Sequence, residues 1–324
     1  MATAATPVAN LEVVEEKRTS ESLFRQALRR LRRDRLTLVA MFVLFIIGML
    51  SVLAPNIQAA LGVSYTRTNV TAAFLPPCIP FLGVGPAECD PRHILGTDDL
   101  GRDHLVRLLY GGRISLSIAL AAAIISIVIG VGLGMVTGYF GGIVDDFVVW
   151  LITTLNSIPS LFLLLIVSAV IITNPNFSGT FLSGPFALVL ILGFLGWTGT
   201  ARLVRGETLS IREREYILGA RAMGASSGRI MLIHILPNLI SVVVITLALD
   251  IGSLILVEAG LSFLGLGVKA PEPSWGNMLS QAQTYFNKGP HLVVFPGLFI
   301  FLTVLCLYVI GDGIRDAFDP TQKD

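Results

Sequence analysis

Six long apolar stretches constrain the fold of this chain more than any other feature. Each is about as long as the roughly 20 apolar residues that an α-helix needs to cross a bilayer. The alternation of apolar and polar residues that is typical of a membrane β-barrel is absent from them. We therefore predict an all-α membrane protein with six transmembrane helices, at residues 36–54, 114–137, 147–173, 186–204, 239–262 and 292–310.

The composition agrees with this class. Of the 324 residues, 53% are hydrophobic and 14% are charged, whereas a soluble domain carries roughly 25% charged residues. So few charges exclude a typical soluble enzyme. The formal net charge of +1 gives no electrostatic reason to expect binding of nucleic acid, and three cysteines exclude a disulfide-dense scaffold.

The distribution of Lys and Arg predicts the orientation. Sixteen of these 23 residues fall on the side of the N-terminus, and the positive-inside rule then places both termini in the cytoplasm. The predicted parts are a cytoplasmic tail (1–35), a first span (36–54), an extracytoplasmic loop (55–113), a five-helix core (114–311) with a cytoplasmic loop (205–238), and a C-terminal tail (312–324). The Arg-rich N-terminal tail fits either an amphipathic helix on the inner leaflet or a plain orientation signal. A cleaved signal peptide does not fit, because the polar leader is too long.

The extracytoplasmic loop carries two features of note. Cys78 and Cys89 lie in a compartment that permits disulfides. A bond between them and a pair of free thiols are both compatible with the sequence.

Three aspartates of the same loop fall within GTDDLGRD at 96–103, but they lack the EF-hand spacing of a calcium site. We expect a solvated turn that caps a helical segment starting at His104, and no metal site.

Glycines and polar residues interrupt the spans. Four glycines recur every four residues between Gly130 and Gly142, which predicts a close helix–helix contact.

Two polar residues within the spans are candidates for function. Asn156 precedes Pro159, which bends the third span. Asp250 lies near the middle of the fifth span, where a charge costs roughly 2.5–3.5 kcal/mol. We regard Asn156 and Asp250 as candidates for a translocation pathway; structural polar contacts are the alternative.

The loop between the fourth and fifth spans is the most informative segment. Helix-forming residues from Ile211 to Met223 precede Gly224, and Ser226 or Ser227 can start a second helix. The pattern predicts a helix–glycine–helix elbow that projects from the membrane.

One face of the predicted elbow carries Tyr216, Ala220 and Met223 at helical spacing. Such a face suits docking to a soluble partner. A plain surface loop is the alternative.

The elbow resembles the "EAA" loop of ABC importer permeases, with the pattern E-A-A-x3-G-x9-I-x-L-P. The matching positions are Ala220, Gly224, Leu236 and Pro237. The departures are Leu218, Gly219 and His234, which stand where Glu, Ala and Ile are usual.

Seven ordered blocks resemble the "C" permease subunits of dipeptide, oligopeptide and nickel importers. They are HILGTDDLGRD (93–103), GARAMGAS (219–226), HILPN (234–238), LSFLGLGV (261–268), PSWGNML (273–279), FPGLFIFLTVL (295–305) and GDGIRDAFDP (311–320). The resemblance covers about residues 20–320 and indicates the family, not the substrate.

The resemblance implies a type I ABC importer permease in the cytoplasmic membrane of a bacterium. It implies a homologous second permease, two ABC ATPase subunits that bind ATP and Mg, and an extracytoplasmic binding protein that delivers di- or oligopeptides. Nickel complexes or another small solute stay open. The coupling residues carried over are Glu213, Glu215, Tyr216, Ala220, Arg221, Gly224 and Ala225, with Glu215 as a substitute for the Glu missing at position 218.

No catalytic residue and no cofactor site is predicted on the chain itself. The phosphate-binding motif G-x-x-x-x-G-K-[ST] is absent from the sequence, so ATP hydrolysis is expected on partner subunits. The four histidines never form a ligand pair at helical spacing. An ion-coupled secondary transporter is the alternative from another class. Such a transporter would need charged residues buried in the membrane and usually an internal repeat. Asp250 is one such charge, and no repeat is visible in the sequence.

Overall fold

The computed structural model describes residues 23–78, 89–172 and 184–318. Within these ranges the chain is helical, and its one β-bridge joins Thr97 and Asp103. The α-helices are α1 (Leu23–Leu31), α2 (Arg35–Val52), α3 (Ala54–Leu61), α4 (His104–Phe140), α5 (Gly142–Asn156), α6 (Ser160–Ile172), α7 (Pro185–Arg212), α8 (Glu215–Ala222), α9 (Ser227–Arg229), α10 (Leu236–Phe263), α11 (Trp275–Met278), α12 (Ala282–Tyr285) and α13 (His291–Phe318). A 3₁₀ turn covers Val70–Ala72, and a π-helical segment, Ile230–Ile235, joins α9 to α10.

Five helical segments are long and apolar enough to cross a membrane: α2, α4, α7, the continuous run Ser227–Phe263, and α13. The pair α5–α6 makes a sixth if it counts as one span. The all-helical class is therefore confirmed. The third span is not the continuous helix predicted at 147–173, because α5 and α6 meet at 84°. Pro159 lies at this break, where proline can neither donate a backbone hydrogen bond nor leave the preceding residue free to be helical.

Helix α4 is longer than the sequence pattern indicated. We predicted a span at 114–137, whereas the helix runs over 37 residues from His104 to Phe140. At 1.5 Å per residue it is about 55 Å long, well beyond a hydrocarbon core of about 30 Å. The carboxylate of Asp103 accepts a hydrogen bond from the backbone N–H of Val106 (2.8 Å), which confirms the predicted cap. Residues 104–113 are thus helical and not part of an irregular loop.

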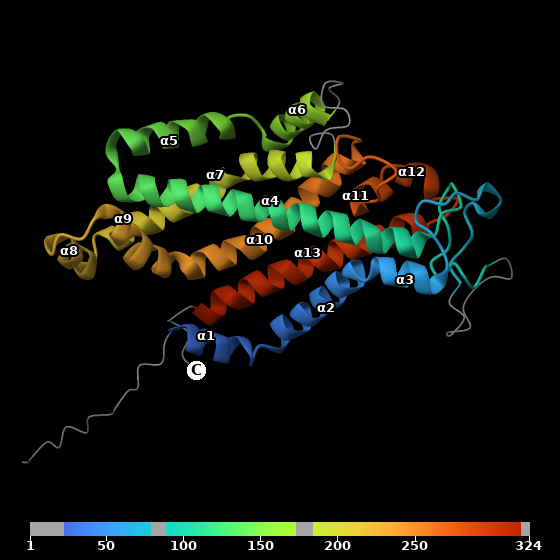
Figure 1. Ribbon diagram of the computed structural model, residues 1–324, viewed down its shortest axis with the longest axis horizontal. Coiled ribbons are helices and arrows are strands. Elements are labelled where there is room, and N and C mark those ends of the chain that lie inside the picture. The colour runs from blue at the N-terminus through green and yellow to red at the C-terminus, as the bar shows by residue number, and fades with distance from the viewer. Residues whose placement is uncertain (1–22, 79–88, 173–183, 319–324) are drawn as a thin grey trace, which may run out of the picture.

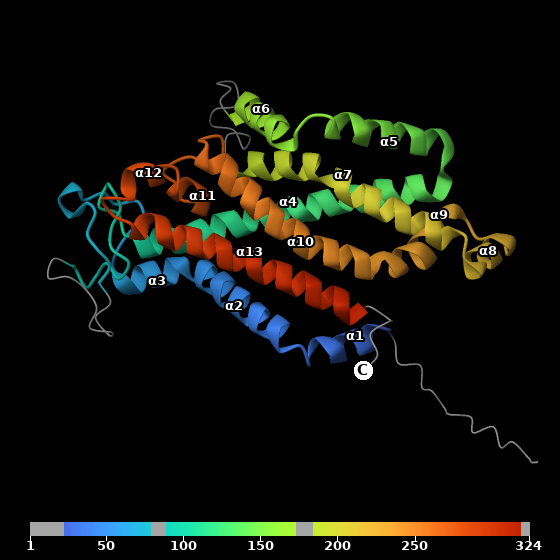
Figure 2. The ribbon, with the colours of Figure 1, turned by 180° about the vertical axis from the view of Figure 1, so that it is seen from behind.

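Helices α4 and α7 lie side by side in the middle of the molecule (Figures 1 and 2). The most apolar stretch of α7 is 61% buried, whereas the corresponding stretches of α2 and of the run containing α10 are each 22% buried. The main core forms where α4 and α7 meet α10 and α13. Helices α5 and α6 lie along one edge, against α4 and α7 respectively.

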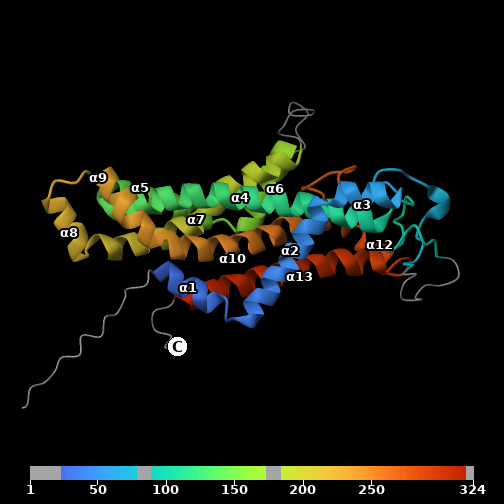
Figure 3. The same cartoon turned by 60° about the horizontal axis from the view of Figure 1, so that its bottom comes forward.

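The N-terminal helices pack against α13. Helix α2 crosses α13, and α1 lies beside the C-terminal part of α13 (Figure 3). Ala27 of α1 is buried, and Asp34 caps α2 by accepting a hydrogen bond from Leu36 N (3.0 Å). We call the end of the molecule that carries α8 and α9 the elbow end, and the end that carries α3, α11 and α12 the loop end (Figure 1).

Candidate functional site

The predicted elbow is present as two helical arms around Gly224. Helix α8 ends at Ala222, and Gly224 then adopts a left-handed conformation with φ +81°. Its N–H donates to Arg221 O, and Ala225 N donates to Ala220 O, both at 3.0 Å. These bonds satisfy carbonyl groups that the helix end would otherwise leave unpaired. A side chain at position 224 would meet no atom within 4 Å, so the turn needs glycine for its backbone angle and not for space.

The second arm of the elbow is the beginning of α10. Helix α9 starts at Ser227, although Ser226 makes no capping bond with its side chain. Helical structure then continues without a break through the π-helical segment to Phe263. The second arm of the elbow and α10 therefore form one continuous helical run.

The inner face of α8 packs against this second arm and against α4. Ile217 and Ala220 are buried in a cluster with residues of α4, α7, the π-helical segment and α10. We predicted Ala220 on an exposed face with Tyr216 and Met223, and this is wrong: Ala220 is 5% exposed, whereas Tyr216 and Met223 are 44% and 85% exposed. Ala220 follows Ile217 by three residues, so the two share the inward face of the helix.

The outer face of the elbow carries most of the other predicted coupling residues. Glu213, Glu215, Arg221 and Gly224 are exposed and Ala225 is partly buried. Leu218, at the position where the family pattern has Glu, is also exposed. The free surface thus combines charge of both signs with large apolar side chains, which suits a protein partner.

Arg221 of α8 and Arg212, the last residue of α7, both contact the end of α4. The guanidinium of Arg221 lies 5.5 Å above the ring centre of Tyr139. Arg212 Nη1 donates to Gly138 O (2.9 Å). The elbow is therefore attached to α4 by an apolar cluster and by the contact of Arg221.

Helices α4 and α7 approach each other through the predicted glycine face. A Cβ atom built on Gly134 would lie 2.5 Å from Ala201 O, and those built on Gly130 and Gly138 would lie 2.7 Å from threonine side chains of α7. Gly142 does not belong to this face, because it has φ +56° after the end of α4 and meets nothing within 4 Å. The small residues let the two backbones touch, as in tight membrane-helix pairs.

The two candidate pathway residues bind to opposite sides of α7. Thr198 Oγ1 donates to Asn156 Oδ1 (3.4 Å), and Thr200 Oγ1 donates to Asp250 Oδ2 (3.2 Å). Residues two apart on a helix point about 200° apart, so α7 stands between the amide and the carboxylate. The structure does not bring Asn156 and Asp250 together.

The loop end holds a buried ion-pair network that the sequence did not indicate. Asp98 is 6% exposed, and its Oδ2 lies 2.7 Å from Arg102 Nε and 3.2 Å from Arg107 Nε. We predicted that Asp98 lies in a solvated turn, and this is wrong because the residue is buried.

The neighbouring Asp99 lies 3.6 Å from Arg102 Nη2. Burial of the Tyr285 phenol, together with its hydrogen bond to Asp99, raises the pKa of Tyr285. In the described part of the chain, no three His, Cys, Asp or Glu residues could hold a metal ion.

A second polar cluster that the sequence pattern missed surrounds Glu258. This carboxylate is fully buried and accepts hydrogen bonds from Ser115 Oγ (2.8 Å) and Ser262 Oγ (2.6 Å). Trp275 N donates to Ser115 Oγ (3.2 Å). Only the local Glu258–Ser262 spacing of four was visible in the sequence, since Ser115 and Trp275 are far away along the chain. The cluster joins α4, α10 and α11.

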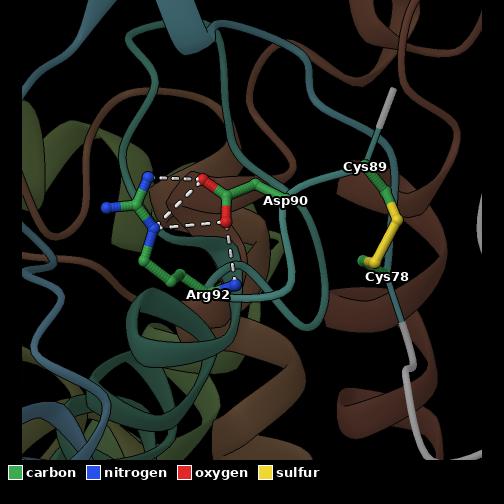
Figure 4. The surroundings of a disulfide bond; sticks show 4 residues. All are labelled: Cys78, Cys89, Asp90 and Arg92. Atoms are coloured by element: carbon green, nitrogen blue, oxygen red, sulfur yellow. Dashed lines mark hydrogen bonds and ion pairs between the residues drawn. A yellow bond between two sulfur atoms is a disulfide. The ribbon is translucent and has the colours of Figure 1, made fainter. Parts of the chain in front are cut away.

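Cys78 and Cys89 are bonded to each other in the structure, with their Cα atoms 5.3 Å apart (Figure 4). Beside them Arg92 donates to both carboxylate oxygens of Asp90 through its guanidinium, and its backbone N–H donates to Oδ1 (3.0 Å). The hydrogen bonds from Arg92 lower the pKa of Asp90 to about 2. The residues between the two cysteines lie outside the described part of the chain.

Two protein-family models match this chain. Residues 130–324 match the family model described as "Binding-protein-dependent transport system inner membrane component". Residues 22–77 match the model "N-terminal TM domain of oligopeptide transport permease C". The two matches cover most of the chain.

Curated relatives match over nearly the whole length. The chain is 34% identical to the dipeptide transport system permease protein of Alkalihalophilus pseudofirmus, over 98% of this chain and 96% of that protein. It is 34% identical to the oligopeptide transport system permease protein of Bacillus subtilis, over 99% and 96%. It is 37% identical to the oligopeptide transport system permease protein of Escherichia coli, over 97% of both chains.

Proposed function

The chain belongs to the family of binding-protein-dependent transport system inner membrane components, and we propose that it is the permease subunit of a bacterial ABC importer for di- or oligopeptides. The relatives named above are dipeptide and oligopeptide permeases, which supports the substrate class. In this proposal the elbow end faces the cytoplasm and the loop end faces the outside. The chain itself is a transport subunit and not an enzyme.

The observation that carries the proposal is the continuity between the elbow and α10. Helix α8 packs through Ile217 and Ala220 against the beginning of the helical run that reaches from Ser227 to Phe263. An ATPase that binds the exposed face of α8 can therefore displace this run. Helices α4 and α7, whose backbones are in contact, move as one body. Closure of two ATPases around ATP would draw the two elbows of the paired permeases together and open the pathway outward.

Within this model Glu213, Glu215 and Tyr216 contact the ATPase directly, because they lie on the exposed face. Ala220 acts from inside, by holding α8 against the α9–α10 arm. In this proposal Asp250 of α10 and its hydrogen-bond partner Thr200 of α7 border the translocation pathway. Asn156 lies on the opposite side of α7, so it does not line the pathway together with Asp250.

Reconstitution tests the proposed function. The chain is combined with its second permease, the two ATPases and the binding protein in lipid vesicles. We expect uptake of a radiolabelled peptide that requires ATP and the binding protein. Uptake by the chain alone, driven by an ion gradient, would instead identify a secondary carrier.

Cross-linking tests the role of the elbow. Met223→Cys, labelled with a photoactivated cross-linker, should attach to the ATPase, because residue 223 is the most exposed large apolar residue of the elbow. The matched control is Val70→Cys, which is 73% exposed at the loop end and should give no ATPase adduct. Both variants are made in a Cys306→Ala background, since Cys306 is the free cysteine. Equal labelling of the ATPase from both positions would refute the docking model.

A further inference from the structure

A cavity of about 450 Å³ opens at the loop end. Its walls come from residues 98–107, from the turn 265–270 after α10, from α11 and α12, and from the first turn of α13. These segments lie far apart in the sequence. The volume falls within the range of about 300–1,000 Å³ that is typical of small-ligand sites.

The charges that line this outer cavity are not balanced. Asp98 and Asp99 supply two carboxylates, and Arg102, Arg107 and Lys269 supply three cations. Both carboxylates are already engaged by the two arginines, as described above. One positive charge therefore remains without a counter-charge on the cavity wall.

Lys269 is that remaining cation. Its Nζ donates to the backbone carbonyl of Ile172 (3.3 Å) and forms no ion pair in the described part of the chain. An ammonium group has three N–H donors, so Lys269 keeps donors for a ligand. Its side chain is exposed, which leaves it free to reorient.

A second, independent feature of the wall is an unpartnered nitrogen. His104 is 2% exposed and lines the cavity, and its Nε2 has no hydrogen-bond partner within the described residues. Its ring stands edge-on to that of His291 at 5.7 Å between ring centres. A buried polar atom without a partner costs free energy. In the tautomer that carries the proton on Nε2, a ligand oxygen can accept a hydrogen bond from this nitrogen and remove that cost.

We propose that the outer cavity binds a carboxylate group, with Lys269 Nζ and His104 Nε2 as donors. The inference rests on the proposed function, because it assigns a ligand to the face that receives substrate. The carboxylate can have two sources: the C-terminus of the transported peptide, or an Asp or Glu side chain of the docked binding protein. Both present the same charge and the same two acceptor oxygens.

The test uses the complete importer in lipid nanodiscs with Lys269→Met, Lys269→Arg and Lys288→Met. Lys288 is the matched control, since it is the other lysine of the loop end, lies 5.8 Å above the ring centre of Phe74 and does not line the cavity. One arm measures the affinity of peptide-free binding protein for the nanodiscs. The other arm measures ATP-driven uptake of trialanine into vesicles at saturating peptide-loaded binding protein.

Loss of one charge-assisted hydrogen bond predicts an effect of about tenfold. If the binding protein supplies the carboxylate, Lys269→Met weakens docking about tenfold. If the peptide supplies it, docking is unchanged and uptake falls about tenfold. In either case Lys269→Arg stays close to wild type and Lys288→Met changes both measurements less than twofold.

The carboxylate site is overturned if Lys269→Met stays within twofold of wild type in both arms, or if Lys288→Met causes an equal loss. Failure of the proposed function has a different signature, because the wild-type importer would then show no ATP-driven uptake. Lys269 is exposed, and Lys269→Arg keeps the charge at this position, so a loss seen in Lys269→Met and absent from Lys269→Arg reports the charge and not the fold.

Discussion

The α4–α7 interface and the elbow both depend on glycine, but for different physical reasons. In α4, Gly134 is needed because a Cβ atom would meet the backbone of α7 at 2.5 Å. In the elbow, Gly224 stands in open space and is needed for its φ of +81°. The first glycine locks two helices together along their length. The second sets the angle of a small lever that is attached on one face only. The structure thus combines a closely packed helix pair with a small element that is held on one face.

The largest change in the free energy of unfolding is expected from a substitution at the α4–α7 interface. Gly134→Val should destabilise the folded chain by about 3 kcal/mol, because backbone atoms of α7 cannot move aside cheaply. Thermal unfolding of the purified chain in detergent measures the loss. The control is Gly132→Val in the same helix, where a Cβ meets nothing within 4 Å and the midpoint should hardly change. Equal shifts for both variants would contradict the close-contact interpretation.

A smaller and local effect is expected inside the elbow. Ile217→Ala should release α8 from its cluster at a cost of about 2 kcal/mol, the lower end of the range for a buried isoleucine. Hydrogen exchange should then accelerate in α8 while α4 and α7 keep their protection. The neighbouring Leu218→Ala, 45% exposed, should leave exchange near wild type. If Ile217→Ala unfolds α4 and α7 as well, the elbow is not an independent lever.

Gly224→Ala should cost about 1 kcal/mol, because alanine adopts a left-handed backbone less readily. The strain should loosen the turn, which limited proteolysis at the elbow would detect, and it should reduce the ATPase stimulation of an assembled importer. Gly228→Ala is the control, since Gly228 has no positive φ and open space around its Cβ position. Wild-type coupling in Gly224→Ala would show that the elbow angle is unimportant.

The smallest effect concerns the polar attachment of the elbow to α4. Replacing Arg221 by Gln should cost about 0.5 kcal/mol, as expected for an exposed cation–π contact. A double-mutant cycle with Tyr139→Leu isolates this contact. A coupling energy indistinguishable from zero would leave the apolar cluster as the main attachment.

Much of the fold was predictable because its signals are local. A run of apolar residues of bilayer length predicts a span, four-residue glycine spacing predicts a helix contact, and Pro159 predicts a break. The glycine at 224 likewise marked the elbow. Even so, the sequence did not show that the break at Pro159 is as sharp as 84°, because the packing of α6 against α7 sets that angle.

Ala220 shows where helical periodicity was insufficient. Its spacing fits a face with Tyr216 and equally a face with Ile217, and small size does not tell the two apart. In the structure Ala220 lies on the inward face, where it is buried with Ile217 in one apolar cluster. Burial of these two apolar side chains away from water stabilises this orientation of α8.

The amino-acid sequence by itself determined the membrane class, the approximate spans and the glycine at the elbow turn, since each of these depends on composition or on spacings within one segment. The family was indicated separately, by the resemblance of seven ordered sequence blocks to known permeases. The tertiary structure alone decided the buried Glu258 cluster, the Asp98 ion pairs and the outer cavity. Glu258 meets a serine 143 positions away, and the cavity unites residues from 98 to 292. Contacts across such distances carry no local pattern, because they exist only once the helices have packed.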